Sequence, residues 1–174
     1  MKVYISGKIG EGGISETTRE KFARAEEMLK AKGHEVFNPC DERWQSLLKR
    51  EYENDSYVKS PWLTGKFPDF YSYCLLRDLM VLSTKDAVYM LADWKRYPDA
   101  TAEYHFALAT GKKLLFRAKN HAFDYLKDEF FAKLDGGQLS EDQMKAPWNE
   151  VLNQYIHNHL DEVWLPVERK EADV

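Results

Sequence analysis

Two carboxylates, Glu103 and Asp78, are the side chains of this chain whose types and positions best suit nucleophilic or acid–base chemistry. The alanine-rich sequence after residue 98 predicts a helix, and Glu103 lies in its first turns, after a polar loop (92–98) and an apolar strand (87–91). Glu103 and Ala107 share a face of this helix, so an inward-facing Glu103 would be partly buried, which raises the pKa of a carboxyl. If it faces outward instead, it is one more surface charge.

Asp78 belongs to a second predicted helix, at residues 70–83, which ends just before the strand that begins at Ala87. It follows Arg77 and precedes an apolar stretch, so it could point toward the same sheet edge as Glu103. The alternative is a surface carboxylate paired with a neighbour.

A glycine-rich loop after the first predicted strand is the other feature of chemical interest. It comprises residues 6–13 and precedes a helix, but it matches neither the dinucleotide pattern G-x-G-x-x-G nor the Walker pattern. Glycines allow a ligand to approach the backbone, a helix N-terminus favours an anion, and Lys8 adds a cation. Glu11 and Glu16 count against a strongly anionic ligand, and a flexible loop with a solvated lysine remains the alternative.

Alternating strands and helices must position these groups. Short β-rich runs at 3–5, 35–38, 87–91 and 113–116 are separated by helical patterns, which predicts a parallel α/β sheet with right-handed crossovers. Thr17 and Glu20 have the spacing of a capping box at the start of the first helix, and Gly33 marks its end. Residues 41–69 read as an insert or lid, helical at 42–52, and residues 120–165 as a C-terminal helical extension.

The length of 174 residues suits a single domain spanning residues 1–174. A net charge of −4 without a Lys/Arg cluster argues against duplex nucleic acid, and a small molecule is the better default partner. No apolar run reaches the ~18–20 residues of a membrane span. Two cysteines, and an N-terminus that enters a strand without a signal-peptide pattern, favour a cytoplasmic protein.

The histidines and cysteines favour neither a metal site nor a thiol nucleophile. His157 and His159 point to different faces of a helix, and no group of potential ligands has zinc spacing. Neither Cys40 nor Cys74 has a histidine nearby in the sequence. We therefore expect no metal and no cofactor, with the chemistry left to side chains.

The order of several segments resembles the nucleoside 2-deoxyribosyltransferase-like superfamily, and within it the branch of phage and bacterial proteins called DUF4406. These segments are VYISGKIG, the strand ending in FNP, RDLMVLSTKDAVYML, and the stretch ending in TAEYHFALATGKKLLF, and they lie within residues 1–116. The resemblance implies a Rossmann-like or flavodoxin-like α/β domain, with a mostly parallel sheet of about four to five strands flanked by helices.

The resemblance also assigns roles. Glu103 takes the place of the nucleophile, and Asp78 that of the aspartate that handles the base. The segment that surrounds the sugar, or a 5′-phosphate, corresponds to the first strand and the glycine loop, and further contacts come from the loop before Glu103. The implied substrate-binding residues are Tyr4, Ser6, Gly7, Lys8, Ile9, Gly10, Asp93, Trp94, Tyr97 and Asp99. Tyr97 and Asp99 depart from the family, which commonly has a small polar or acidic residue and a glycine there.

The implied activity is cleavage or transfer of the N-glycosidic bond of a (deoxy)nucleoside or its 5′-monophosphate, through a glycosyl enzyme on Glu103. Water as acceptor gives a hydrolase, and a second base gives a transferase. The rival is a module that binds a nucleotide in the same pocket without cleaving it, which the departures at Tyr97 and Asp99 favour; a vestigial pocket is a third possibility. The apolar stripe that begins at Trp148 and the habit of the family predict a homodimer or larger homo-oligomer.

Overall fold

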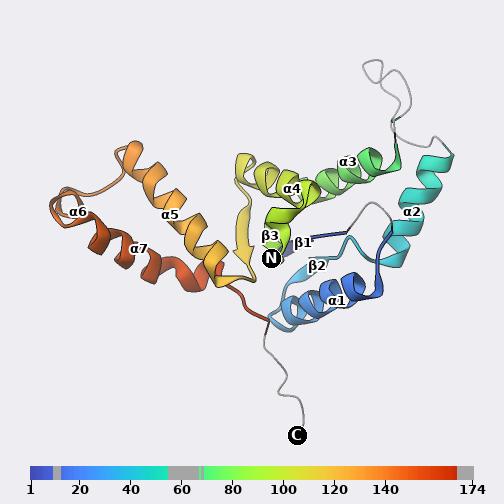
Figure 1. Cartoon of the computed structure of the whole chain (residues 1–174), viewed down its shortest axis with the longest axis horizontal. Coiled ribbons are helices and arrows are strands. Elements are labelled where there is room, and N and C mark those ends of the chain that lie inside the picture. Colours follow the sequence, from blue (N-terminus) through green and yellow to red (C-terminus); the bar gives the residue numbers. More distant parts are fainter. Residues whose placement is uncertain (10–12, 55–66, 68, 168–174) are drawn as a thin grey trace, which may run out of the picture. The chain divides into compact units, whose positions relative to one another are not determined.

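A parallel four-stranded sheet organises the N-terminal two thirds of the chain (Figure 1). The computed structural model describes residues 1–9, 13–54, 67 and 69–167. The strands are β1 (Lys2–Ser6), β2 (Glu35–Phe37), β3 (Ala87–Met90) and β4 (Lys113–Phe116), in the order β2-β1-β3-β4. The predicted α/β class and parallel sheet are therefore confirmed, with four strands.

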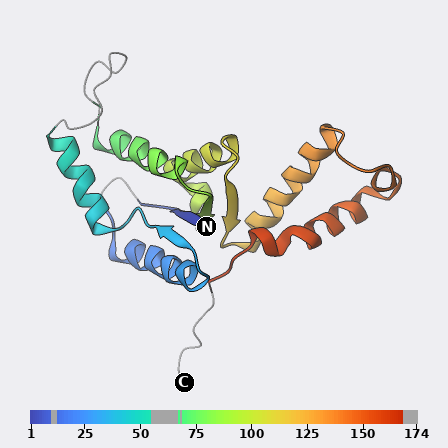
Figure 2. The same cartoon turned by 180° about the vertical axis from the view of Figure 1, so that it is seen from behind.

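The central strands are apolar because both of their faces are covered by helices. From Val3 to Ser6 every residue of β1 is buried, as is all of β3. Helix α1 (Glu16–Ala31) covers one face, and α3 (Phe70–Ser83) and α4 (Pro98–Ala109) cover the other (Figures 1 and 2). Alternate residues of a strand point to opposite faces, so Tyr4 and Ser6 share one face of β1.

The strand order reverses beside β1: β2 is added on one side of β1, and β3 and β4 are added on the other side. From β1 the chain moves outward to β2, and it then returns across β1 to β3, with β1 pairing in parallel with both neighbours. This is the order of flavodoxin-like sheets, whose ligands bind outside the carboxyl ends of the strands at the reversal. The loops that follow β1 and β3, and the start of α4, all lie at this position.

Local signals set the ends of the helices, and one prediction about them is wrong. Helix α1 begins after Ser15, whose hydroxyl accepts the Thr18 N–H at 3.2 Å, so Thr17 and Glu20 do not form its cap. Ser15 is the better cap because its backbone is extended where the helix starts. Gly33 ends the helix with a φ of +82°, as predicted.

The predicted insert at 41–69 begins with a regular helix. Helix α2 (Glu42–Glu53) starts after Asp41, whose carboxylate accepts the Arg43 N–H at 2.8 Å. It joins α3 through Glu51, which accepts a hydrogen bond from the Tyr73 hydroxyl at 2.6 Å and pairs with Arg77 at 3.1 Å. Most of the remaining insert, including Tyr57 and Trp62 of the expected lid, lies outside the described residues.

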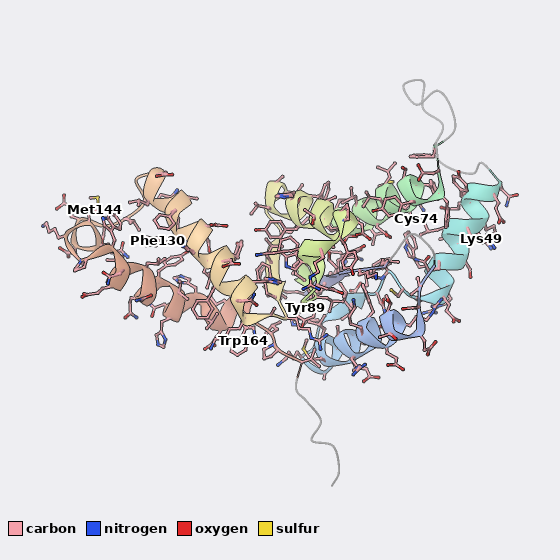
Figure 3. The ribbon with its side chains drawn as sticks, in the orientation of Figure 1. Lys49, Cys74, Tyr89, Phe130, Met144 and Trp164 are labelled. Carbon is pink, nitrogen blue, oxygen red and sulfur yellow. The ribbon has the colours of Figure 1, made fainter. Side chains whose placement is uncertain are left out.

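The chain divides into two compact units, Met1–Leu114 and Leu115–Val174, and each is described by itself. The second contains α5 (Lys119–Asp135), the short α6 (Glu141–Lys145) and α7 (Trp148–Val163). Phe130 of α5 packs against Tyr155 of α7, with ring centroids 5.4 Å apart, and Figure 3 labels Phe130 on α5. The predicted C-terminal helical segment is thus present, whereas its membership of one domain with residues 1–114 stays a prediction.

None of the helices in the described part of the chain is both long and apolar enough to cross a membrane.

Candidate active site

Glu103 is a buried residue in the first half of α4, and two hydroxyl groups of β1 donate hydrogen bonds to its carboxylate. Only 3% of the residue is exposed. The Tyr4 hydroxyl donates to Oε1 at 2.6 Å, and the Ser6 hydroxyl donates to Oε2 at 2.5 Å. Burial, and then the nearby Asp78, raise the pKa of Glu103 to about 8, while the two hydrogen bonds oppose that rise. The inward orientation of Glu103 is confirmed.

Asp78 is the second buried carboxyl of the site, and 5% of it is exposed. The indole N–H of Trp44, on α2, donates to its Oδ1 at 2.9 Å. Burial raises the pKa of Asp78 to about 7, with a smaller contribution from Asp99, and the Trp44 hydrogen bond opposes the rise. Asp78 is therefore not the paired surface carboxylate of the alternative interpretation.

Both carboxyls line one cavity of about 210 Å³ in the first unit. Its wall is formed by the loop after β1, by α2, by one face of α3 and by the start of α4. Among its lining residues are Cys74, Leu75 and Asp78, which are three and four positions apart and so share a face of α3. Figure 3 labels Cys74 on α3. The cavity is thus mainly apolar on the α3 side and acidic toward α4.

Asp99 is the third carboxyl of the cavity wall. It lies one helical turn before Glu103 on α4, so the two side chains are on the same side of the helix. Burial raises the pKa of Asp99, and the nearby backbone N–H groups of Ala100, Asp99 itself and Ile9 oppose the rise. Asp99 is among the residues that line the cavity, and Tyr97 is not.

The glycine loop after β1 forms part of the cavity wall. Ile9 and Gly13 line the cavity, whereas Gly10 lies outside the described residues. A Cβ atom on Gly7 would lie 2.8 Å from Cδ1 of Leu91, so this glycine is required for packing beside β3. Lys8 lies over the ring of Tyr97, 5.0 Å from its centroid, and neither residue is among those lining the cavity.

The loop after β3 is held by the protein's own side chains. Asp93 accepts a hydrogen bond from Lys21 of α1 at 2.6 Å, and its other oxygen is buried without a hydrogen-bond partner among the described residues. Trp94 is 5% exposed and stacks on Tyr104, with centroids 4.4 Å apart. Neither Asp93 nor Trp94 lines the cavity, although both were expected to contact a substrate.

The sequence analysis did not predict that Trp44 and several residues of the cavity wall belong to the site. Trp44 donates to Asp78 and packs edge-on against Phe37, which in turn stacks on Tyr4. The insert at 41–69 is rich in aromatic residues, but its sequence does not indicate which ring reaches the site. The additional lining residues are Ile14, Gln45, Phe70, Tyr71, Cys74 and Leu75.

The two thiols are poorly suited to act as nucleophiles. Burial raises the pKa of Cys40 to about 12 and that of Cys74 to about 12, so both remain protonated at neutral pH. Among the described residues, no group of three or more His, Cys, Asp or Glu side chains is arranged to hold a metal ion. The groups available for chemistry in this cavity are therefore its carboxyls.

Comparison with protein families finds a match to the model of DUF4406, a domain of unknown function, over residues 1–116. Searches of curated proteins and of solved structures found no match. The matched segment contains all four strands, Asp78, Asp99 and Glu103. Since the match covers about two thirds of the sequence, the chain belongs to the DUF4406 family.

Proposed function

We propose that this DUF4406 protein breaks or transfers the N-glycosidic bond of a nucleoside, with Glu103 as the nucleophile and Asp78 as the acid. The substrate class is a (deoxy)nucleoside or its 5′-monophosphate, and the proposal includes a place for the chain in the nucleoside 2-deoxyribosyltransferase-like superfamily. One observation supports it most. Glu103 and Asp78 line one cavity, and each is buried and held by a hydrogen-bond donor from another element.

The reaction has two steps, as in retaining glycosidases. A carboxylate oxygen of Glu103 attacks C1′ of the sugar and forms a C–O bond, while the C1′–N bond breaks and its electron pair leaves with the base. Asp78 gives its proton to the departing base. Water or a second base then attacks C1′, the bond to Glu103 breaks, Asp78 takes up the proton that is released, and both side chains return to their starting forms.

The site supplies the protonation states that these steps need. Glu103 must be ionised and Asp78 protonated, so the productive form carries one proton on the pair. With pKa values raised to about 7 for Asp78 and about 8 for Glu103, the pair holds one proton near neutral pH; this proton lies mainly on Glu103, and the productive form is the less populated one in which it lies on Asp78. The hydroxyls of Tyr4 and Ser6 both donate to Glu103, which favours its ionised form over its protonated form.

The test is chromatography of the protein after incubation with nucleosides, deoxynucleosides and their 5′-monophosphates, with and without an acceptor base. We expect free base, or a new nucleoside, from one substrate class. Glu103→Ala and the nearly isosteric Glu103→Gln should abolish the product without unfolding the chain. Glu162→Gln, which removes an exposed carboxylate of α7, serves as the matched control and should retain the activity of the wild type. Comparable turnover by Glu103→Gln and the wild type would exclude Glu103 from the mechanism.

A non-catalytic binding module is the second candidate, and the acidic wall of the cavity is the observation that favours it. Asp99 places a third carboxyl beside Glu103 and Asp78, where the family usually has glycine. A module of this kind would bind a nucleoside or nucleotide, as seen by calorimetry, and would release no base. It would also keep its ligand when Glu103 is replaced, whereas a covalent mechanism requires that carboxylate for product formation.

A further inference from the structure

One ring of β2, that of Phe37, contacts both aromatic side chains that donate hydrogen bonds to the buried carboxyls. Its centroid lies 5.6 Å from that of Tyr4, at an interplanar angle of 17°, and 5.3 Å from that of Trp44, at 83°. The Tyr4 hydroxyl donates to Glu103, and the Trp44 indole N–H donates to Asp78. A continuous row of three aromatic rings therefore connects the donor of one carboxyl with the donor of the other.

The register of the sheet and the start of α2 determine this row. Phe37 and Tyr4 are paired residues of the parallel strands β2 and β1, so their side chains lie next to each other on one face of the sheet. Strand β2 ends at Phe37, and α2 begins at Glu42, after the cap at Asp41. Trp44 lies in the first turn of α2, where its ring meets the edge of Phe37.

Phe37 can affect the carboxyls only through the alignment of these donors. Its side chain exchanges no proton, and it is not among the described residues that line the cavity. A hydrogen bond weakens steeply as the angle at the hydrogen departs from linearity. The packing that fixes the Tyr4 and Trp44 rings therefore determines how well their O–H and N–H groups stabilise a carboxylate.

The charged groups around the row come from α2, α3 and the turn before β3. The Arg77 guanidinium lies 5.6 Å from the Trp44 centroid and is paired with Glu51 at 3.1 Å. Lys85 Nζ lies 5.5 Å from the Phe37 centroid. The other titratable groups near the two carboxyls are Asp99, Cys40 and Cys74. A substitution of Phe37 removes none of these groups and neither donor, so a change in titration would report on alignment.

We infer that Phe37 is a positioning residue that aligns both aromatic donors with their carboxylates and so couples the two halves of the site. Its catalytic consequence rests on the proposed function. Burial raises the pKa of both carboxyls, and the donors oppose that rise. Removing the ring should therefore raise both pKa values further. The rise should be larger for Asp78, which has a single donor in the described part of the chain, than for Glu103, which also accepts from Ser6.

The first arm of the test measures titration and requires no turnover. Protein with ¹³C-labelled Asp and Glu carboxyls is titrated by NMR, and the two signals are identified by their loss in Asp78→Asn and Glu103→Gln. In Phe37→Leu we expect the apparent pKa of Asp78 to rise by at least about 0.5, a roughly threefold change in proton affinity, and that of Glu103 to rise less. Phe37→Tyr keeps the ring and should titrate like the wild type.

Phe22→Leu is the matched control, because it removes a fully buried ring of α1, the helix that covers the other face of the sheet. It should lower the free energy of unfolding and leave both titrations unchanged. Phe37→Met, which keeps more of the volume of the side chain, repeats the comparison if Phe37→Leu does not fold. Wild-type titrations in the folded Phe37 variants that lack the ring, or equal changes in Phe22→Leu, would overturn the inference.

The second arm applies once base release is found. The pH profile of kcat/KM reports on the free protein, so both of its limbs should move to higher pH in Phe37→Leu by the amounts that NMR gives. KM should stay close to that of the wild type, because Phe37 is not among the described lining residues. Shifted titrations without base release from any substrate would contradict the proposed function and support the inference. Base release with the same pH profile in Phe37→Leu and the wild type would overturn it.

Discussion

Glu103 is held by opposing effects that together set its proton affinity. Burial and the neighbouring carboxyl of Asp78 favour the neutral acid, whereas the hydroxyls of Tyr4 and Ser6 favour the carboxylate. A fully solvated glutamate would be ionised at neutral pH but would be a weaker nucleophile, and an isolated buried glutamate would stay protonated. The donors on β1 therefore make a buried, ionised Glu103 attainable.

The rate of base release should depend on pH as a bell-shaped curve. Below about 7 the carboxyl pair holds two protons and lacks a nucleophile, and above about 8 it holds none and lacks an acid. We expect the maximum of kcat/KM between these values. Asp78→Asn has no carboxyl proton to lose at this position. Its residual rate of base release should therefore no longer fall as the pH rises above about 8. A wild-type rate that is constant across this range would contradict the assignment.

The stability of the fold should also depend on pH through Glu103. Its pKa is raised from 4.5 in a model peptide to about 8 in the folded chain, so the folded state binds the proton more tightly than the unfolded state. The stabilising effect is complete below about 4.5 and is lost as the pH rises to about 8. The unfolding free energy of Glu103→Gln, minus that of the wild type, should therefore increase between about pH 5 and about pH 8 in urea titrations. For Glu162→Gln the same difference should stay constant.

At the scale of secondary-structure elements, α2 and α3 act together to position Asp78. Glu51 of α2 binds Tyr73 and Arg77 of α3, and one further contact, from Trp44, reaches the carboxylate itself. The helix that carries the acid is thus joined to the helix that carries its hydrogen-bond donor.

Trp44→Phe should move the pH profile of base release to higher pH. The indole N–H stabilises the ionised form of Asp78, and phenylalanine cannot donate a hydrogen bond, so the pKa of Asp78 should rise further. The aromatic ring retains an edge contact with Phe37. Trp148→Phe, at an exposed position of α7, is the control and should leave the profile in place. A Trp44→Phe profile that matches the wild type would assign Trp44 a packing role only.

The sequence was sufficient for features that depend on local pattern. Apolar runs predicted the strands, Gly33 the end of α1, and the position of Glu103 beside Ala107 its burial. The sequence was insufficient where the role of a residue depends on a partner that lies far away in the sequence. Trp44 lies 34 positions from Asp78, and Gly7 is required by Leu91, which no local spacing indicates. Nor did local spacing indicate that Asp93 pairs with Lys21 and that Trp94 stacks on Tyr104, and the ligand contacts expected of Asp93 and Trp94 stay a prediction.

At the scale of the whole molecule, the candidate site belongs to the first unit alone. The lining residues of the cavity run from Ile9 to Glu103, and the DUF4406 match ends at residue 116. The second unit has a core of its own between α5 and α7, in which Phe130 is 1% exposed. On α7, Val151, Tyr155 and Ile156 are buried whereas Trp148 is 47% exposed. The homo-oligomer expected from this stripe stays a prediction, for which light scattering gives the mass.

Phe130→Leu should weaken the second unit without changing the chemistry. The smaller side chain loses contacts with Tyr155 and Trp148, which should lower the free energy of unfolding by about 0.5–3 kcal/mol in denaturant titrations. Base release per folded molecule should equal that of the wild type, because Phe130 lies outside the unit that forms the cavity. A large loss of kcat in fully folded Phe130→Leu would show that the second unit contributes to the reaction.

The most direct measurement of the central claim is mass spectrometry of the protein quenched during incubation with a deoxynucleoside. If Glu103 is the nucleophile, the intact chain should gain the mass of one deoxyribosyl group, and fragmentation should locate it on Glu103. Glu103→Gln should gain nothing under the same conditions, and Glu162→Gln should behave like the wild type. Base release accompanied by no adduct, or by an adduct on another residue, would contradict the assignment of Glu103 as the nucleophile.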